Sequence, residues 1–286
     1  MTGLGAILTA IVTPFDADGR VNDDAFVRIL NHLADNGSDG VVVAGTTGEA
    51  PTLSDEEHLA LIGLAVGEAP DGFTVVAGTG SNDTRHAVHL TERATELGAD
   101  AMLSVTPYYN RPNRRGILSH FDAVSRATDK PIVLYNIPSR TGTDMPNDLL
   151  AELAQLPNID AVKQANAANL APVDGLELYA GDDHLLRDTL ELGGAGGITV
   201  ASHIVGPRLK EMCDSPERRD AIHDQLADVF ESLSVTVNPI PIKTAMNLLG
   251  FDAGGFRLPL VEASASELTT VREMLERQNL LTAAAS

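Results

Sequence analysis

The sequence has little cysteine and no long apolar run, and each shortage excludes a class of protein. Its single cysteine, Cys213, excludes an intrachain disulfide and fits a reducing compartment, where we expect a small buried or helix-surface thiol rather than a nucleophile. The longest apolar runs fall far short of the ~20 residues that a membrane-spanning helix needs. The first residues, MTGLGAILTAIVTPFD, lack the basic region and cleavage site of a signal peptide. We therefore expect a soluble, cytoplasmic protein.

Positive charge is also scarce. The chain has 20 Lys and Arg against 40 Asp and Glu, a net charge of −20 that disfavours nucleic acids and anionic membranes as partners. Acidic stretches such as SDEEH and DADGRVNDD are typical of a solvated surface, and an acid excess of this size resembles salt adaptation. Only four of the 20 basic residues are lysines: Lys130, Lys163, Lys210 and Lys243.

Short apolar runs rich in β-branched residues alternate along the chain with amphipathic segments. Such runs are typical of parallel strands that are covered on both faces. The predicted strands are 6–13, 40–45, 73–78, 101–107, 131–136, 159–164, 176–181 and 196–202. Predicted helices between them include 23–36, 54–69, 83–98 and 115–128, with a capping box at Ser54 and Glu57.

Eight strand–helix units predict a (β/α)8 TIM barrel, an α/β fold that commonly takes roughly 250 residues. A Rossmann-like sheet would need a G-x-G-x-x-G turn after its first strand, and TPFDADGR stands there instead. We predict a catalytic barrel over residues 1–206. Residues 207–286 are predicted to form helices at about 207–232, 239–249 and 265–280, packed on the barrel as one structural unit.

Polar residues gather where the predicted strands end, which is where barrels of this kind place their chemistry. Lys163 follows the alternating apolar residues of the strand predicted at 159–164 and can lie in the mouth of the barrel. Burial lowers the pKa of an amine, and a neutral amine attacks a carbonyl to form an imine. By residue type alone, a salt-bridged or snorkelling lysine is the commoner case.

The neighbours of Lys163 favour the chemical interpretation. Tyr135 ends the preceding strand at a similar height and can relay protons if other hydroxyls support it. Thr46 and Thr47, in a glycine-flanked turn, can supply those hydroxyls or bind a small carboxylate. Each residue also has an ordinary alternative: an aromatic core cap for Tyr135, and turn formation for the two threonines.

Several motifs identify a resemblance to the dihydrodipicolinate synthase family, within the pyruvate-dependent class I aldolase superfamily that includes N-acetylneuraminate lyase. The motifs are GTTGEAPTL, TPYYNRP, LYNIPSRTG, the strand lysine in AVK, AGDD and NPIPIK, and they extend from about residue 5 to about residue 282. GTTGE and the tyrosine–lysine pair indicate the superfamily, whereas PSRTG and NPIPIK favour the synthase within it.

The resemblance implies catalytic roles for four residues. Lys163 would form the Schiff base with pyruvate, and Tyr135 would relay protons. Thr46 would link Tyr135 to Tyr109, which a neighbouring subunit would contribute. The family norm is a homotetramer built as a dimer of dimers, so the resemblance makes assembly part of the mechanism.

The resemblance also implies four substrate-binding positions. Thr47 would hold the pyruvate carboxylate, and Arg140 would bind the carboxylate of aspartate semialdehyde with its planar fork. Backbone groups at Gly181 and Ile198 would line the pocket. No metal and no organic cofactor are implied.

Two departures from the family pattern concern the charge near the Lys163 imine and inhibition by L-lysine. Gln164 stands where the family usually has Glu or Asp, which removes a negative charge near the imine. In the site where many members bind inhibitory L-lysine, Asp55 and His86 replace His and Glu. Three residues match that site: His58, Asn82 and Tyr108. Without the acidic partner for a lysine ammonium, we expect weak or absent inhibition.

The leading hypothesis is a lyase of the class I aldolase type that condenses pyruvate with aspartate semialdehyde, on the diaminopimelate route to lysine. The alternative keeps the imine but acts on a 2-keto-3-deoxy sugar acid. Arg140 favours the first, because a sugar-cleaving site needs residues that bind hydroxyls at its mouth. A non-catalytic keto-acid-binding protein is disfavoured by the intact set of Lys163, Tyr135, Thr46 and Tyr109. His86 and His89 have helical spacing but lack a convincing carboxylate or cysteine partner set, so we expect them on a helix surface.

Overall fold

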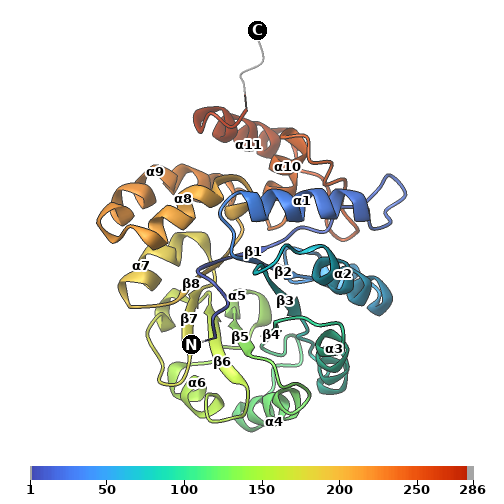
Figure 1. Ribbon diagram of the computed structural model, residues 1–286, viewed down its shortest axis with the longest axis vertical. Helices are drawn as coiled ribbons and strands as arrows, with labels where there is room; N and C mark the ends of the chain where they lie inside the picture. The colour runs from blue at the N-terminus through green and yellow to red at the C-terminus, as the bar shows by residue number, and fades with distance from the viewer. Residues whose placement is uncertain (1, 282–286) are drawn as a thin grey trace.

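The computed structural model describes residues 2–281 and forms a closed barrel of eight parallel strands in chain order (Figure 1). Pairing of the first strand with the eighth closes the barrel. The strands are β1 (Ile7–Ala10), β2 (Gly40–Val43), β3 (Thr74–Gly78), β4 (Ala101–Val105), β5 (Ile132–Asn136), β6 (Ile159–Gln164), β7 (Glu177–Ala180) and β8 (Gly196–Thr199). Each lies inside its predicted range, so the predicted (β/α)8 fold is confirmed.

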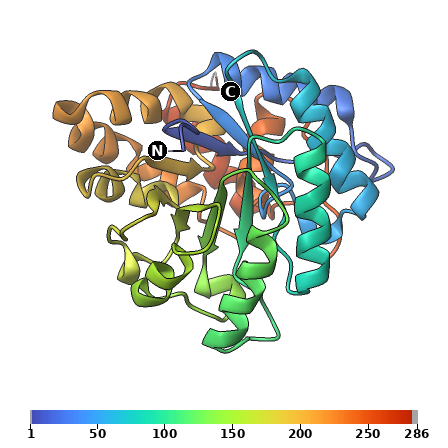
Figure 2. The same ribbon diagram turned by 60° about the horizontal axis from the view of Figure 1, so that its bottom comes forward.

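Helices surround the strands, and two more lie beyond α1 and α8 at the upper edge of Figure 1. The helices are α1 (Asp23–Asp35), α2 (Asp55–Glu68), α3 (Thr84–Glu96), α4 (Arg114–Ser125), α5 (Pro138–Thr141), α6 (Asn147–Leu153), α7 (Leu186–Glu191), α8 (Ser202–Asp214), α9 (Arg219–Ser232), α10 (Ile240–Leu248) and α11 (Ala265–Arg277). The four helices predicted between strands are confirmed, and the capping box at Ser54 and Glu57 forms at the start of α2. Figure 2 shows the same ring of helices around the strands from a tilted view.

The single helix predicted over 207–232 is wrong. The chain forms α8 and α9 instead, separated by a short 3-10 turn that begins at Pro216. A proline disfavours helical backbone at the residue before it, and Ser215 has φ −125° and ψ 81°. Helix α8 also begins before the predicted barrel boundary at residue 206, with a kink at Val205 that accommodates Pro207. Met1 and residues 282–286, the end of the predicted C-terminal segment, lie outside the described residues.

Side chains of the strands alternate between the barrel lumen and the layer beneath the helices. On β5, Val133 and Tyr135 belong to the cluster inside the barrel, whereas Ile132 and Leu134 pack in the outer layer. On β6, Ala161 faces the lumen and Val162 the helices. This period of two directs every second residue at the end of a strand into the mouth of the barrel.

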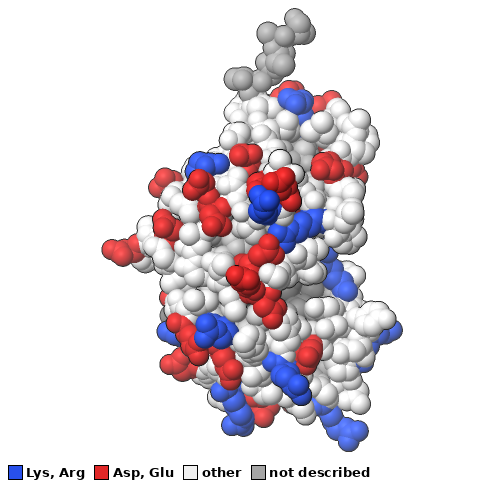
Figure 3. Space-filling view, turned by 90° about the vertical axis from the view of Figure 1, so that its right-hand side faces the viewer, with Lys and Arg blue, Asp and Glu red and all other residues white. Residues whose placement is uncertain are grey.

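Acidic and basic side chains are interspersed on the face shown in Figure 3, so this face carries no patch of a single charge. That view agrees with the expectation of a solvated surface. Within residues 2–281, no helix is both long enough and apolar enough to cross a membrane.

Cys213 lies in α8 with its thiol half-buried. Burial raises the pKa of the thiol to about 12, so the group stays protonated at neutral pH. The thiol therefore has the inert environment expected from the sequence.

Candidate active site

Lys163 lies near the C-terminal end of β6 with its side chain in the barrel lumen. The strand register places it opposite Tyr135 of β5, and its Nζ lies 4.3 Å from the centroid of the tyrosine ring. Both residues are only 5% exposed. The structure thus brings together the two residues on which the predicted imine chemistry depends.

The environment of Lys163 makes its amine easier to deprotonate. Burial lowers the pKa of Lys163 from 10.5 to about 8, while the nearby carboxylates of Asp182 and Asp183 oppose that shift and Arg140 adds to it. At pH 7 roughly a tenth of the amine is then neutral, compared with well under a thousandth for an exposed lysine. A reactive amine is therefore available at physiological pH without a further base.

Tyr135 keeps its proton at neutral pH. Burial raises the pKa of its phenol well above 10, Asp182 adds to that rise, and Arg140 and a hydrogen bond with Thr46 oppose it. Its hydrogen bond with Thr46 is the contact that a proton relay through these two hydroxyls would need.

Thr47 is buried and belongs to a small polar network at the mouth of the barrel. Asn238 Nδ2 donates to Thr47 Oγ1 at 3.0 Å, and Arg140 Nη2 donates to the main-chain oxygen of Asn238 at 3.2 Å. Asn238 was not predicted as a site residue. It begins the NPIPIK motif, but its contact with Thr47 spans 191 positions of the chain.

Two adjoining cavities meet at Tyr135 and Arg140. The inner one measures about 100 Å³ and is lined by Lys163 and Thr47, among others. The outer one measures about 390 Å³ and is more open. A liquid water molecule occupies about 30 Å³, so the inner cavity suits a ligand of a few heavy atoms. A small acid at Lys163 would leave the outer cavity for a second substrate.

The two predicted backbone positions differ. Gly181 lines the inner cavity, and a Cβ there would lie 2.6 Å from the backbone nitrogen of Ala165, so only glycine fits. Ile198 is buried in the lumen cluster and is not among the residues that line either cavity. Val200, two residues further along, lines the inner cavity instead.

Asp183 is a second residue that the sequence analysis missed, although AGDD was recognised as a motif. Its carboxylate accepts hydrogen bonds from the backbone nitrogens of Val200 at 2.9 Å and Ala201 at 3.1 Å. Burial raises the pKa of Asp183 to about 6 in spite of those two bonds. Asp183 therefore joins the ends of β7 and β8 beside the Lys163 amine.

Tyr109 is separated from the other predicted catalytic residues within one chain. It is 89% exposed, has a left-handed backbone with φ of 69°, and lines neither cavity. Its neighbour Tyr108 lines the outer cavity. Tyr109 therefore has the exposure expected of a residue that acts on another subunit.

The outer cavity also contains Asp55, His58 and His86. His86 Nε2 lies 3.0 Å from Asp55 Oδ1, so His86 has the carboxylate partner that we did not expect. The site therefore does contain an acidic group, contrary to our expectation, because Asp55 supplies it from the start of α2. Within residues 2–281, no group of three His, Cys, Asp or Glu side chains could hold a metal ion.

Gln164, which stands where the family usually has Glu or Asp, is held in a buried hydrogen-bond network. It follows Lys163 on β6, so its side chain points out of the lumen and is fully buried beneath the helices. Its Oε1 accepts from Asn136 Nδ2 at 3.1 Å and from the backbone of Asn166 at 3.0 Å. Gln164 therefore holds the ends of β5 and β6 together.

Known proteins resemble this chain over almost its full length. Residues 3–278 match the model of the dihydrodipicolinate synthetase family. A 4-hydroxy-tetrahydrodipicolinate synthase of Thermosynechococcus vestitus is 43% identical over 98% of this chain and 99% of its own.

Two solved structures extend the similarity to the fold. The lysine-bound enzyme of this family from Cyanidioschyzon merolae matches with a TM-score of 0.94 and 40% identity, over 98% of this chain and 99% of its own. A monomeric dihydrodipicolinate synthase variant matches with a TM-score of 0.94 and 32% identity, over 98% of both chains. Full-length similarity at these identities leaves no other assignment: the chain belongs to the dihydrodipicolinate synthetase family.

Proposed function

We propose that this chain condenses pyruvate with L-aspartate 4-semialdehyde, the reaction of a 4-hydroxy-tetrahydrodipicolinate synthase. The observation that carries the proposal is the buried amine of Lys163, with its pKa lowered to about 8, beside Tyr135 at the mouth of the barrel. A relative at 43% identity bears that name. The product would enter the diaminopimelate route to lysine.

The first stage joins Lys163 to pyruvate. The neutral amine attacks the ketone carbon, a carbon–nitrogen bond forms, and the resulting alcohol leaves as water to give an imine. Tyr135 and Thr46 pass the proton that the departing oxygen requires. Thr47, whose hydroxyl oxygen accepts from Asn238, would donate its O–H to the pyruvate carboxylate, together with N–H groups of its turn.

The second stage forms the carbon–carbon bond. The protonated imine draws electrons from the adjacent methyl group, which gives a proton to the Tyr135 phenolate left by the first stage and becomes the carbon of an enamine. That carbon attacks the aldehyde, whose oxygen takes up a proton from the Tyr135 phenol. The amino group of the second substrate then displaces Lys163 from the carbon–nitrogen double bond, which closes a ring and frees the enzyme.

Arg140 favours the semialdehyde over a sugar acid as the second substrate. It lines both cavities, and its guanidinium carries more N–H donors than the one directed to Asn238. A planar fork matches a carboxylate bidentately. A 2-keto-3-deoxy sugar acid would instead present a row of hydroxyls at this position.

The test compares two rates on one preparation. One assay follows condensation of pyruvate with aspartate semialdehyde, and the other follows cleavage of 2-keto-3-deoxygluconate, with Lys163→Ala as the blank for both. We expect a large preference for the semialdehyde. A preference for the sugar acid would retain the imine but assign the chain to sugar-acid breakdown.

We further propose that the chain works in the cytoplasm as a homotetramer, a dimer of dimers that shares Tyr109 between subunits. The exposure of Tyr109 and the resemblance of TPYYNRP to the family motif support this. A dilute sample shown to be monomeric should then be nearly inactive. Full specific activity in that sample would exclude a shared tyrosine.

A further inference from the structure

The turn that carries Thr46 and Thr47 has an unfavourable backbone. Ala44 before them has φ of 52° and Glu49 after them has φ of 57°. Residues with side chains rarely adopt this left-handed region, and they keep it only where surrounding contacts hold it. Inside the turn, Glu49 N donates to Thr46 O at 3.1 Å, so the position of Glu49 affects that of Thr46 directly.

The carboxylate of Glu49 is held by a lysine from the C-terminal helices. Lys243 Nζ lies 2.7 Å from Glu49 Oε1, and the two side chains are 0% and 1% exposed. The ammonium also donates to Gly255 O at 2.6 Å and lies over the rings of Phe15 and Phe256, at 4.3 and 4.8 Å. A charge this deeply buried is tolerated only when it is paired, so each partner fixes the place of the other.

Helix α10 and the residues just before it contact the turn at two points. Lys243 of α10 bonds with Glu49, and Asn238, two residues before the helix, bonds with Thr47. Lys243 N donates to Pro239 O at 3.0 Å, so both contacts belong to one rigid segment. The NPIPIK motif thus holds the threonine turn from outside the barrel.

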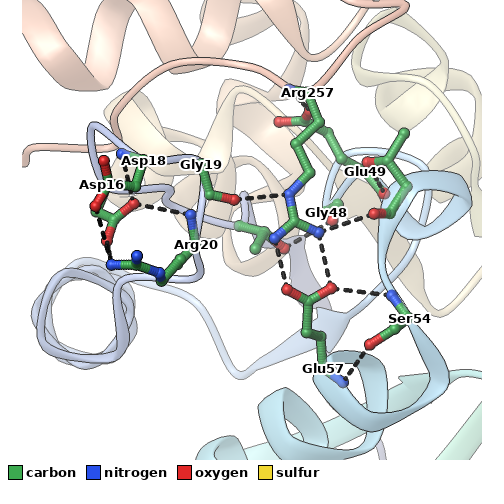
Figure 4. A network of polar contacts seen from close by, with 11 residues as sticks. Asp16, Asp18, Gly19, Arg20, Gly48, Glu49, Ser54, Glu57 and Arg257 are labelled. Carbon is green, nitrogen blue, oxygen red and sulfur yellow. Dashed lines mark hydrogen bonds and ion pairs between the residues drawn. The ribbon is translucent and has the colours of Figure 1, made fainter.

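Arg257 secures the far end of the same loop (Figure 4). Its guanidinium donates to both oxygens of Glu57, at 2.8 and 2.6 Å, and to Thr52 O at 2.8 Å. Glu57 in turn accepts from the backbone of Ser54 at the start of α2. The loop is therefore fixed at Glu49 by α10 and at Glu57 by the segment that follows α10.

We propose that the Glu49–Lys243 ion pair is a positioning device, through which α10 sets Thr46 and Thr47 for proton transfer and carboxylate binding. This inference rests on the proposed function, since it assigns those roles to the two threonines. The Lys163 amine itself lies on β6 rather than on this turn. At saturating pyruvate, loss of the pair should therefore lower turnover much more than the final fraction of chains trapped as the imine.

The chain contains a matched control. Lys210 Nζ lies 2.9 Å from Asp39 Oδ1. Asp39 comes immediately before β2, whereas Glu49 comes after the same strand. Asp39 also accepts from the backbone of Ala6 and Ile7, at the end of the barrel away from the site. Lys210→Met thus removes the same ammonium from a part-buried pair at the opposite end of one strand.

The experiment compares Lys243→Met with Lys210→Met and the unchanged chain. For each, borohydride with saturating pyruvate and intact mass give the fraction of chains that form an imine, and steady-state assays give kcat and KM. For Lys243→Met we expect full imine trapping, a raised KM for pyruvate and a fall of about 100-fold in kcat/KM, a loss that a 1 Å misplacement of reacting groups can cause. Lys210→Met should have the same trapped fraction and the same kcat/KM as the unchanged chain.

Other outcomes separate the two proposals. If Lys243→Met loses imine formation and turnover equally, the variant has simply unfolded, and if it loses neither, the ion pair has no role. Either result overturns the positioning device. If Lys243→Met does not fold, the double variant Glu49→Gln/Lys243→Met, which buries no unpaired charge, takes its place in the test. Failure of both variants to fold would also overturn the positioning device. Absence of imine in the unchanged chain would instead overturn the proposed function.

Discussion

Replacement of the buried amine should stabilise the folded protein while abolishing catalysis. Lys163→Met keeps most of the side-chain volume and removes the group whose charge the lumen disfavours. The folded chain holds Lys163 with a pKa of about 8, against 10.5 for an ordinary lysine. Because each pKa unit corresponds to 1.36 kcal/mol, the charged amine costs the folded state about 3 kcal/mol at neutral pH.

The sign of the effect fixes its dependence on pH. Between pH 8 and 10.5 the unfolded chain binds the proton more tightly, so the stability of the unchanged protein rises with pH across that window. Below pH 8 the penalty is complete. The free energy of unfolding of Lys163→Met should therefore exceed that of the unchanged protein by about 3 kcal/mol at pH 7, which corresponds to roughly 6 °C in the midpoint of thermal unfolding. Above pH 10 the difference should be much smaller.

Thermal unfolding at pH 7 and pH 10, at one protein concentration, measures this difference. Lys130→Met, a partly exposed lysine, is the control and should show no comparable gain. A destabilised Lys163→Met at pH 7, or a gain that is the same at both pH values, would refute the account of a desolvated amine.

Four further predictions concern the second substrate, acid stability, regulation and salt. Arg140→Gln should raise KM for the semialdehyde at least about tenfold, because a charged hydrogen bond is lost, and leave pyruvate trapping unchanged; an unchanged KM would remove Arg140 from substrate binding. Burial lowers the pKa of His203, which joins Val12 and Val200, from 6.5 to about 4, so the chain should lose about 3 kcal/mol as pH falls through that window. Urea unfolding at pH 7 and pH 4 would show this loss as a difference in the free energy of unfolding. His203→Gln should make that difference smaller, and an equal difference in the variant would contradict the prediction. Millimolar L-lysine should change the rate little, because the Asp55 carboxylate that could pair with its ammonium already bonds with His86. Inhibition by micromolar L-lysine would contradict this prediction. Activity should persist in molar KCl if the acidic surface is an adaptation to salt, and inactivation there would end that interpretation.

The barrel could be predicted from the sequence because each of its strands is a short apolar run between amphipathic segments. The helix boundaries near residue 207 could not, because the kink at Val205 lets α8 include Pro207. A local pattern treats a proline as a helix start, whereas tertiary packing decides whether the helix continues through a bend.

The candidate site was partly predictable for the same reason. Lys163 and Tyr135 end neighbouring strands, so their positions in the sequence already place them together. Asn238 was missed because its partner Thr47 lies 191 positions away in the chain and meets it only through packing. Asp183 was missed because its partners are main-chain N–H groups, which the side-chain pattern does not reveal. The alternation along a strand also predicts that Gln164, next to Lys163, faces away from the lumen, where it is fully buried.

The central claim is that Lys163 forms an imine with pyruvate, and one measurement tests it most directly. The protein is reduced with borohydride in the presence of pyruvate, digested, and mapped by mass spectrometry, with Lys163→Ala treated in parallel. We predict a single adduct on the peptide that contains Lys163 and none in the variant. An adduct on Lys130, Lys210 or Lys243, or an adduct that survives in Lys163→Ala, would contradict the account.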